Sequence, residues 1–361
     1  MGSTLHIIEP TLRTRDGHCA SLVECIVHEC RPKFDEIVVW AGRGGRLGSI
    51  EGARLQEYFP QAGRKLVMFH LLTRLLRKPG RILISTATPT DLSILRLAHE
   101  FVRRPEGRAA AFVHWYTAKQ KRLRRRLMLE WVVKGPQPIR VLTPTPGVAE
   151  RLGSVGFRDV HVVPYPMVWN ATPAVSDDAP RLLVPGGVRQ DKGFFEVVEY
   201  VAWLKERGLS IGIDVQVTLG HYRRKLQQDL EDAVTRLREI DYPHLRLIDR
   251  TPEKEYAEMF RGCVVLQPYH ASAFADRISG VTLDAFAAGS PVIVNAGTWS
   301  ADEVTRTGAG VVLGATDPQT IHAAVEAIFA DIRHYREAAC AASELKRSEQ
   351  LQSVLAQAMA E

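Results

Sequence analysis

Short apolar runs rich in β-branched residues alternate with longer stretches of helical periodicity along almost the whole chain. This alternation is typical of βα units, whose parallel strands are covered by helices. In the first half we expect strands at Leu5–Ile8, Glu36–Trp40, Arg81–Ile84, Ala110–Val113, Arg140–Leu142 and His161–Val163. In the second half we expect them at Arg181–Val184, Gly212–Val217, Leu245–Ile248, Val264–Leu266, Pro291–Val294 and Gly310–Val312. The pattern predicts an α/β chain of two doubly wound, Rossmann-like domains.

The length of 361 residues exceeds one ordinary domain and fits two of roughly 150–200 residues each. Residues 169–180 form a polar, proline-punctuated stretch without periodicity, which is the expected hinge. We therefore place the first domain at 1–168 and the second at 181–330. Residues 331–361 form a predicted helical tail with a break near Asp331, and we expect this tail to run back and brace the first domain.

The composition, with 45% hydrophobic and 24% charged residues, is that of an ordinary globular protein. The sequence has no apolar run of ~18 residues and no secretory signal, so we expect a soluble, cytoplasmic protein. Five cysteines without a C-x-x-C pair favour a reducing compartment. Cys25, His28 and Cys30 are close in sequence, but further metal ligands at a suitable spacing are missing, so buried helix residues are the better interpretation. The net charge of +6 indicates an anionic partner.

A glycine-rich turn connects a predicted strand to a predicted helix in the segment that starts at Leu182 and reads Leu-Leu-Val-Pro-Gly-Gly-Val-Arg-Gln-Asp-Lys-Gly-Phe-Phe. Gly186 and Gly187 let the backbone approach a ligand closely. Arg189 and Lys192 follow where two cations can hold a diphosphate, since Arg forks onto phosphate oxygens and Lys supplies a point charge. Solvated basic residues after an ordinary turn are the alternative.

A second segment combines two carboxylates with a helix start. After the strand end at Pro268-Tyr269-His270 and a loop, a helix is expected from Ser279-Gly280, whose free backbone N–H groups would attract an anion. Asp276 precedes this helix and Asp284 lies within it, about two turns away. Each carboxylate can accept hydrogen bonds from vicinal sugar hydroxyls. A loop-cap acid and a solvated helix acid are the alternatives.

These two segments resemble the C-terminal half of the large retaining GT-B glycosyltransferase family, in its group-1 or family-4-like bacterial form, over roughly Leu182 to Val312. In that family two glutamates with seven residues between them precede a small-residue helix end and a Gly-x-Pro-Val-Ile strand. Here Asp276 and Asp284 have the same spacing before Gly289-Ser290-Pro291-Val292-Ile293, and each acid is one methylene shorter. The resemblance implies the GT-B arrangement, in which two Rossmann-like domains face a cleft.

The resemblance also implies roles for single residues. Arg189 and Lys192 would neutralise the leaving diphosphate, Asp276 would hold the donor sugar, and Asp284 the ribose. The cleft histidine at a strand end would be His114. The further donor-binding residues would be Gly187, Gly220, Arg277, Ser279 and Gly280, with Arg246–Thr251 beside the nucleobase.

The first domain offers candidates on the acceptor side. Gly17 and His18 lie at a predicted helix start in the first loop, which the resemblance makes a cleft contact. His114 follows the strand Ala110–Val113, and a polar residue at the carboxyl end of a strand points into the crevice of an open α/β sheet. An N-cap turn with a surface His, and a structural His, are the alternatives. The glycine-rich run 42–48 lacks the third glycine of a dinucleotide fingerprint, so we interpret it as a flexible acceptor-side loop.

A cationic helix is predicted over Lys119–Trp131, with Leu123, Leu127 and Trp131 at i, i+4 and i+8. This spacing gives an apolar stripe that faces either the core or an anionic membrane surface, where each Lys or Arg adds ~1 kcal/mol. Nucleic acid is not an expected partner, because no nucleic-acid-binding module accompanies the charge.

The resemblance implies hexosyltransferase-type transfer from a UDP- or GDP-sugar to an acceptor hydroxyl, with retention and without a cofactor. No metal is expected, because no Asp-x-Asp pair follows a strand to carry Mg²⁺. The acceptor would be a glycan or lipid-linked glycan of polysaccharide or glycolipid biosynthesis, with the enzyme peripheral on the inner face of the membrane. Two alternatives stay open: an epimerase or phosphorylase of the same fold, and a catalytically silent GT-B binding protein.

Overall fold

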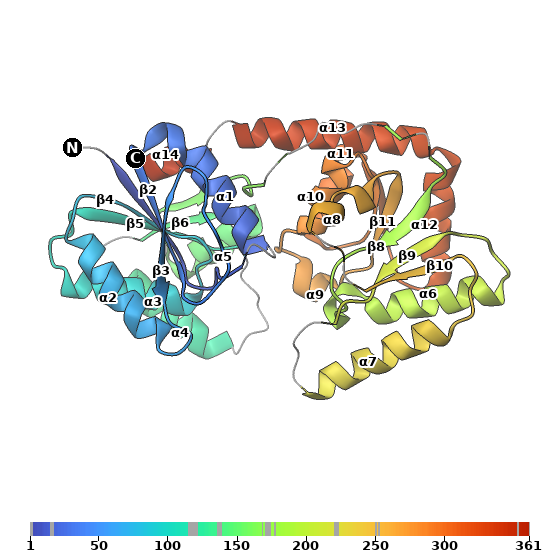
Figure 1. Ribbon diagram of the computed structural model, residues 1–361, viewed down its shortest axis with the longest axis horizontal. Coiled ribbons are helices and arrows are strands. Elements are labelled where there is room, and N and C mark those ends of the chain that lie inside the picture. Colours follow the sequence, from blue (N-terminus) through green and yellow to red (C-terminus); the bar gives the residue numbers. More distant parts are fainter. Residues whose placement is uncertain are drawn as a thin grey trace. The chain divides into compact units, whose positions relative to one another are not determined.

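The computed structural model describes residues 3–14, 18–114, 122–135, 139–167, 169, 175–176, 178–219, 224–249, 251, 253–351 and 354–360. The chain forms two compact units, one of Met1–Val168 with Ser348–Glu361 and the other of Trp169–Arg347. Each unit has its own parallel β-sheet with helices on both faces (Figure 1). Within the described ranges, none of the helices has the length and apolar character needed to cross a membrane.

The described part of the first sheet has seven strands in the order β3-β2-β1-β4-β5-β6-β7, and every neighbouring pair runs parallel. The chain starts at β1, extends the sheet to one edge, and returns through β4 to build the other side, which is the doubly wound topology. The strands are β1 (Thr4–Glu9), β2 (Glu36–Gly42), β3 (Arg54–Phe59), β4 (Gly80–Ile84), β5 (Gly107–Phe112), β6 (Arg140–Thr143) and β7 (Val160–Val162).

Helices cover both faces of this sheet because its strands are apolar on both sides. On β1, Ile8 packs with helices α2 to α5 and Ile7 packs with α1 and α14, since successive side chains point to opposite faces. Both isoleucines are fully buried. The helices of this unit are α1 (His18–Cys30), α2 (Arg64–Leu76), α3 (Pro89–Phe101), α4 (Arg122–Val133), α5 (Pro146–Val155) and α14 (Val354–Ala360), with a 3-10 turn at Arg31–Lys33.

All six strands predicted for the first half are present, but the sequence pattern misses β3. This edge strand reads Arg-Leu-Gln-Glu-Tyr-Phe, and only Phe59 is fully buried. An edge strand is paired on one side only and is partly exposed, so it lacks the continuous apolar run that identifies a central parallel strand.

The glycine-rich run 42–48, expected to be a flexible acceptor-side loop, contacts the loop after β1. The N–H of Arg46 donates to the carbonyl of Arg13 at 2.8 Å. A Cβ on Gly45 would stand 1.8 Å from the same carbonyl oxygen, so the two backbones touch where no other residue fits.

The second sheet, in its described part, has six parallel strands in the order β10-β9-β8-β11-β12-β13. All six strands predicted for the second half are present. They are β8 (Arg181–Val184), β9 (Ile213–Gln216), β10 (Leu245–Ile248), β11 (Cys263–Gln267), β12 (Val292–Asn295) and β13 (Gly310–Leu313).

Helices α6, α7 and α12 pack on one face of the second sheet, and α10, α11 and α13 on the other. Local sequence sets their ends: the Thr298 side chain caps α11, and Gly308 ends that helix in the left-handed conformation. The helices are α6 (Phe194–Glu206), α7 (Arg224–Glu239), α8 (Glu253–Tyr256), α9 (Ala271–Phe274), α10 (Gly280–Ala287), α11 (Trp299–Thr307), α12 (Pro318–Ala330) and α13 (Ile332–Leu351), with 3-10 turns at Gln190–Lys192 and Glu258–Phe260.

The C-terminal tail divides between the two units. The chain breaks at Asp331, where α12 gives way to α13, and residues up to Arg347 belong to the second unit. From Ser348 onward the chain belongs to the first unit, and α14 buries Leu355 and Met359 against α1. The predicted tail 331–361 is therefore not one structural segment, and only its last part braces the first sheet.

Arg336 on α13 ties the described part of the predicted hinge 169–180 to the second unit. Its side chain is 3% exposed and donates hydrogen bonds to the carbonyls of Ser176, Asp178 and Gly262. The buried Arg336 guanidinium thus holds the segment before β8 in place, although this segment forms no helix or strand of its own.

In its described part, the stripe predicted on Lys119–Trp131 does not face the core. Lys119 and the side chain of Leu123 lie outside the described residues. On the described part of α4 the buried residues are Leu129 and Val132, whereas Leu127 is 54% and Trp131 37% exposed. The inward face of α4 is therefore formed by Leu129 and Val132, and Leu127 and Trp131 point away from it.

Candidate functional site

Two loops meet at the point where the strand order of the second sheet reverses. β8 and β11 are neighbours there, although the chain leaves β8 toward β9 and returns at β11. In open α/β sheets, ligands bind in the crevice at the carboxyl ends of such strands. The glycine turn after β8 and the segment Pro268–His270 after β11 therefore frame a candidate site.

A side chain of β9 holds the first of these loops, and backbone contacts join the first loop to the second. Gly186 has a φ of +92°, which favours glycine, and its N–H donates to Gln216 Oε1 at 2.6 Å. The N–H of His270 donates to the carbonyl of Asp191 at 3.0 Å. A Cβ on Gly193 would stand 2.2 Å from the carbonyl oxygen of Pro268, so this glycine is required for the close approach.

Three cations gather around Asp191 in this site. Arg189 forms a two-pronged ion pair with Asp191, with Nε at 2.7 Å from Oδ1 and a second contact from Nη2. Arg277 approaches the same carboxylate to 3.9 Å. Burial, together with the positive charges of Arg189 and Arg277, lowers the pKa of Lys192 to about 8. The sequence pattern identified these cations but gave no role to Asp191, which pairs with the two arginines.

Two packed aromatic rings, Tyr269 and Phe274, each lie beside one of these cations. The Nζ of Lys192 lies 5.5 Å from the centroid of the Tyr269 ring. The ring packs at 4.5 Å between centroids on Phe274, over which the Arg277 guanidinium lies at 4.9 Å. Tyr269 is 4% exposed, and burial raises the pKa of its hydroxyl. Sequence reasoning placed Tyr269 at a strand end and assigned it no role.

The start of α10 lies beside the glycine turn, since a Cβ on Gly186 would stand 3.9 Å from Val281 Cγ2. Ser279 caps the helix by accepting from the N–H of Thr282, and its hydroxyl donates to Gln267 Oε1 at 3.1 Å. A Cβ on Gly280 would meet nothing within 4 Å, so space remains at the helix start. This helix end can receive an anion at its free N–H groups.

Gln267, which sequence reasoning missed, anchors this cap from the end of β11. Its Oε1 accepts from the hydroxyls of Ser279 and Thr282, at 3.1 and 2.9 Å. The side chain is buried, and among the described residues its Nε2 has no partner. In the sequence, the signal was a polar residue at the end of the otherwise apolar run Cys263–Gln267.

The two predicted acids have different surroundings. Asp276 is half-buried in the loop before α10. Burial of Asp302, and then the negative charges of Glu303 and Asp276, raise the pKa of Asp302. Asp284 lies on α10 and accepts a hydrogen bond from Tyr256. Burial raises the pKa of Asp284 to about 7, although the bond from Tyr256 opposes this shift. Tyr256 on α8 was not predicted, because its link to α10 exists only in the fold.

In the first unit, His114 lies two residues beyond β5, as expected from the sequence. It is buried, its Nε2 is 2.8 Å from the carbonyl oxygen of Ser85, and its ring packs on Phe112 and Tyr165. The side chain of Ser85 donates to Glu9 Oε2 at 2.8 Å. These contacts at the carboxyl ends of β1, β4 and β5 hold the imidazole in one orientation.

Glu9 was also missed by sequence reasoning. Its side chain is fully buried, and its carboxylate accepts from the hydroxyls of Ser85 and Thr86 and from the N–H and hydroxyl of Thr11. A carboxylate with this many donors connects the loops after β1 and β4.

Some predicted residues cannot be placed. Gly17 and Gly220 lie outside the described residues; His18 begins α1, but its side chain also lies outside them. Arg246, which was expected beside the nucleobase, lies on β10. It pairs with the buried Asp214, which also binds Arg181, so it forms part of a ladder across β8, β9 and β10.

Comparisons with known proteins agree with this topology. No protein-family model matches the chain, and no match is found among curated protein sequences. Solved structures do match. HepE from Anabaena, determined with UDP and glucose, is 12% identical, with a TM-score of 0.71 over 99% of each chain. Sucrose-phosphate synthase from Thermosynechococcus elongatus is 12% identical, with a TM-score of 0.72 over 97% of each chain.

A third match is the UDP-forming α,α-trehalose-phosphate synthase from Burkholderia vietnamiensis, which is 11% identical, with a TM-score of 0.69 over 97% of each chain. At such low identity the similarity establishes the fold. The protein therefore has the GT-B fold of two Rossmann-like domains, as the sequence motifs predicted.

Proposed function

We propose that the protein is a glycosyltransferase that moves a hexose from a UDP- or GDP-sugar to an acceptor hydroxyl. The observation that carries the proposal is the gathering of Arg189, Lys192 and Arg277 at the carboxyl ends of β8 and β11, next to the start of α10. This arrangement is suited to a diphosphate. Structural neighbours determined with UDP, UDP-glucose and glucose support it.

In this proposal, the cations stabilise negative charge that develops on the leaving diphosphate. Arg189 and Lys192 supply side-chain charge, and the N–H groups at Ser279-Gly280 supply the helix end. Side chains take the part that Mg²⁺ plays in other transferases, so no metal or cofactor is needed. Asp276 holds the donor sugar and Asp284 the ribose, with Gly187 and Gly220 close to the donor.

The acceptor hydroxyl attacks on the face from which the diphosphate leaves, so the anomeric configuration is retained. His114, Gly17 and His18 are the proposed contacts of the first domain with the substrates. The fixed orientation of the His114 imidazole supports a positioning role for it.

The donor is identified by a thermal-shift screen of UDP, GDP, ADP and their sugars. A ligand that binds only the folded protein stabilises it by about 2.7 kcal/mol at ~100 times its Kd. We expect one nucleotide to shift the wild type but not the Arg189→Ala/Lys192→Ala double variant. Lys205→Ala, an exposed cation on α6, is the matched control. An equal shift in the double variant would contradict the diphosphate assignment.

Product analysis then identifies the reaction. Transfer predicts that the sugar appears on the added acceptor, with its anomeric configuration retained, and that excess chelator leaves the rate unchanged. Epimerised nucleotide sugar without an acceptor would indicate the epimerase alternative. Tight nucleotide binding without any turnover would indicate a silent binding protein.

For the acceptor we propose a glycan or lipid-linked glycan of polysaccharide or glycolipid synthesis, at an anionic membrane surface on the cytoplasmic side. Leu127 and Trp131 on α4 support this, because they are exposed beside the basic segment 122–126. Phe101 at the end of α3 is 67% exposed, and α3 packs directly on α4. Exposed apolar side chains among cations suit an anionic lipid surface.

Co-sedimentation with anionic vesicles across a salt series tests the attachment. Binding should weaken as the Debye length falls from ~10 Å at 0.1 M to ~3 Å at 1 M salt. Changing Arg124, Arg125 and Arg126 together to Gln should release the protein, as should Leu127→Ser. If these variants sediment like the wild type, a soluble acceptor is the better hypothesis.

A further inference from the structure

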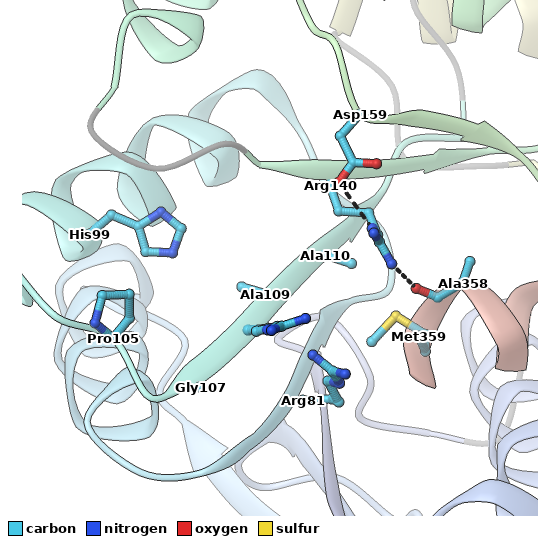
Figure 2. Close-up of a pocket in the computed structure, with 11 residues that line it drawn as sticks. Arg81, His99, Pro105, Gly107, Ala109, Ala110, Arg140, Asp159, Ala358 and Met359 are labelled. Carbon is cyan, nitrogen blue, oxygen red and sulfur yellow. Dashed lines mark hydrogen bonds and ion pairs between the residues drawn. The ribbon is translucent and has the colours of Figure 1, made fainter. Parts of the chain in front are cut away.

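A pocket of about 320 Å³ lies at the amino edge of the first sheet, where β4, β5 and β6 begin (Figure 2). Three arginines line it: Arg81 on β4, Arg108 on β5 and Arg140 on β6. The loops that hold His114 lie at the opposite edge, where Ser85 follows β4. Arg81 and Ser85 are about 13 Å apart, at ~3.3 Å per strand residue. The pocket is therefore separate from the His114 region of the first unit.

The described lining of the pocket carries more positive than negative side chains. Arg140 donates from Nε to Asp159 at 3.0 Å and from Nη1 to the carbonyl of Ala358 at 2.7 Å (Figure 2). Arg81 donates to the carbonyl of Ala360. Among the described residues that line the pocket, Asp159 is the one carboxylate beside three guanidinium groups. Burial, followed by the charges of Arg108 and Arg140, lowers the pKa of Arg81, which is the sign of cations held together.

His99 lines the same pocket from α3 and is 4% exposed. In the described chain, its Nδ1 has no hydrogen-bond partner. Burial lowers the pKa of His99 to about 4, so the ring is neutral at pH 7 and offers one donor and one acceptor. An unpaired buried nitrogen is unfavourable. A polar ligand in the pocket would relieve this cost.

We propose that this pocket binds a small phosphate-bearing anion, held by Arg81, Arg108 and Arg140. Guanidinium groups match phosphate oxygens with paired N–H donors. The volume is at the low end of the ~300–1,000 Å³ range of ligand sites, so pyrophosphate or a small phosphate ester fits better than a nucleotide sugar. The bound anion would connect three strands with the end of α14, and so stabilise the docking of that helix.

Calorimetric titration of the full-length protein with inorganic pyrophosphate tests this proposal. Arg108→Gln removes a cation from an exposed strand position, and Arg104→Gln, in the preceding loop, is the matched control. We expect Arg104→Gln to bind as the wild type does and Arg108→Gln to bind roughly 10–100-fold more weakly, as for one lost hydrogen bond to a charged group. Slower amide exchange in residues 354–360 on binding would locate the anion beside α14. Arg81→Gln is the second variant if Arg108→Gln does not fold.

A diphosphate also fits the proposed donor site, so the titration is repeated with Lys192→Gln. Binding that survives Lys192→Gln but is lost in Arg108→Gln assigns the anion to this pocket. The reverse result, or wild-type affinity in both Arg108→Gln and Arg81→Gln, overturns the proposal. In that case the arginines only hold α14 in place. A nucleotide titration remains the separate test of the donor site, so either proposal can fail without the other.

Discussion

The backbone of Gly186 lies so close to the Lys192 ammonium that a Cβ on the glycine would stand 2.6 Å from Nζ. We therefore predict that Gly186→Ala displaces Lys192 from its place over the Tyr269 ring. With ~1.4–2.7 kcal/mol of charge stabilisation lost, kcat/KM should fall roughly 10–100-fold. The measurement is steady-state kinetics with the donor found in the nucleotide screen.

The matched control is Gly208→Ala at the end of α6. Gly208 also has a positive φ, +63°, but a Cβ there would meet nothing within 4 Å. It carries backbone strain of the same kind without the collision, so stability should fall slightly and kcat/KM should stay near the wild-type value. Equal kinetic losses in the two variants would mean that strain, and not Lys192, explains the effect.

The lowered pKa of Lys192, about 8, predicts a pH-dependent donor affinity. A bound diphosphate favours the charged ammonium, so binding above pH 8 should take up a proton. Affinity should then fall as the pH rises through 8, by up to about tenfold per pH unit. Calorimetry at pH 9, in buffers of different ionisation enthalpy, measures the proton uptake.

Lys192→Arg is the control for this prediction, because a guanidinium keeps its charge throughout this range. Its donor affinity should be nearly flat between pH 7 and 9.5. In the wild type without ligand, Lys192 makes folding more favourable as the pH rises from 8 toward 10.5, because the unfolded chain then binds the additional proton. If the donor affinities of the wild type and of Lys192→Arg change equally with pH, a group other than Lys192 titrates.

Asp284→Asn should stabilise the protein while weakening donor binding. Burial raises the pKa of Asp284 from 3.8 to about 7, so its contribution to stability falls as the pH rises through that window and is least favourable above 7. Asn removes the buried charge and still accepts from Tyr256. We expect a gain of about 1–3 kcal/mol at pH 8 and little change at pH 4.

Chemical denaturation at the two pH values measures this gain. Asp241→Asn, an exposed acid of the same unit, is the control and should change stability by less than ~0.5 kcal/mol. A loss of stability in Asp284→Asn at pH 8 would show that the carboxylate is favourably held. The Asp284 carboxylate would then be assigned a structural role.

The buried hydrogen bonds of Glu9 predict very different losses of stability for two substitutions at this position. Glu9→Ala leaves Ser85, Thr86 and Thr11 without their acceptor and should cost about 2–5 kcal/mol. Glu9→Gln keeps one acceptor oxygen, and the hydroxyls can rotate, so its cost should be below ~2 kcal/mol. Urea unfolding followed at the first unit compares them, and similar losses would contradict the role of the hydrogen bonds.

The strand pattern and the motifs at the second sheet could be read from the sequence, because both depend on neighbours along the chain. Apolar runs identified the central strands of both sheets, and the Asp276 and Asp284 spacing indicated the GT-B fold, which is confirmed. The residue roles, retention and the membrane surface stay predictions. The edge strand β3 was missed because half-exposed strands carry a weak signal.

Only the tertiary structure decided which distant residues meet. Asp191 joins Arg189 to Arg277, nearly ninety positions later, because β8 and β11 are neighbours in the sheet. The three arginines of the amino-edge pocket come together because β4, β5 and β6 pair side by side. The sequence by itself determined the strands, the helices and the residues available for chemistry, since periodicity and turn signals are local. Strand pairing is set by the packing of the whole domain, and it alone determined which of those residues share a site.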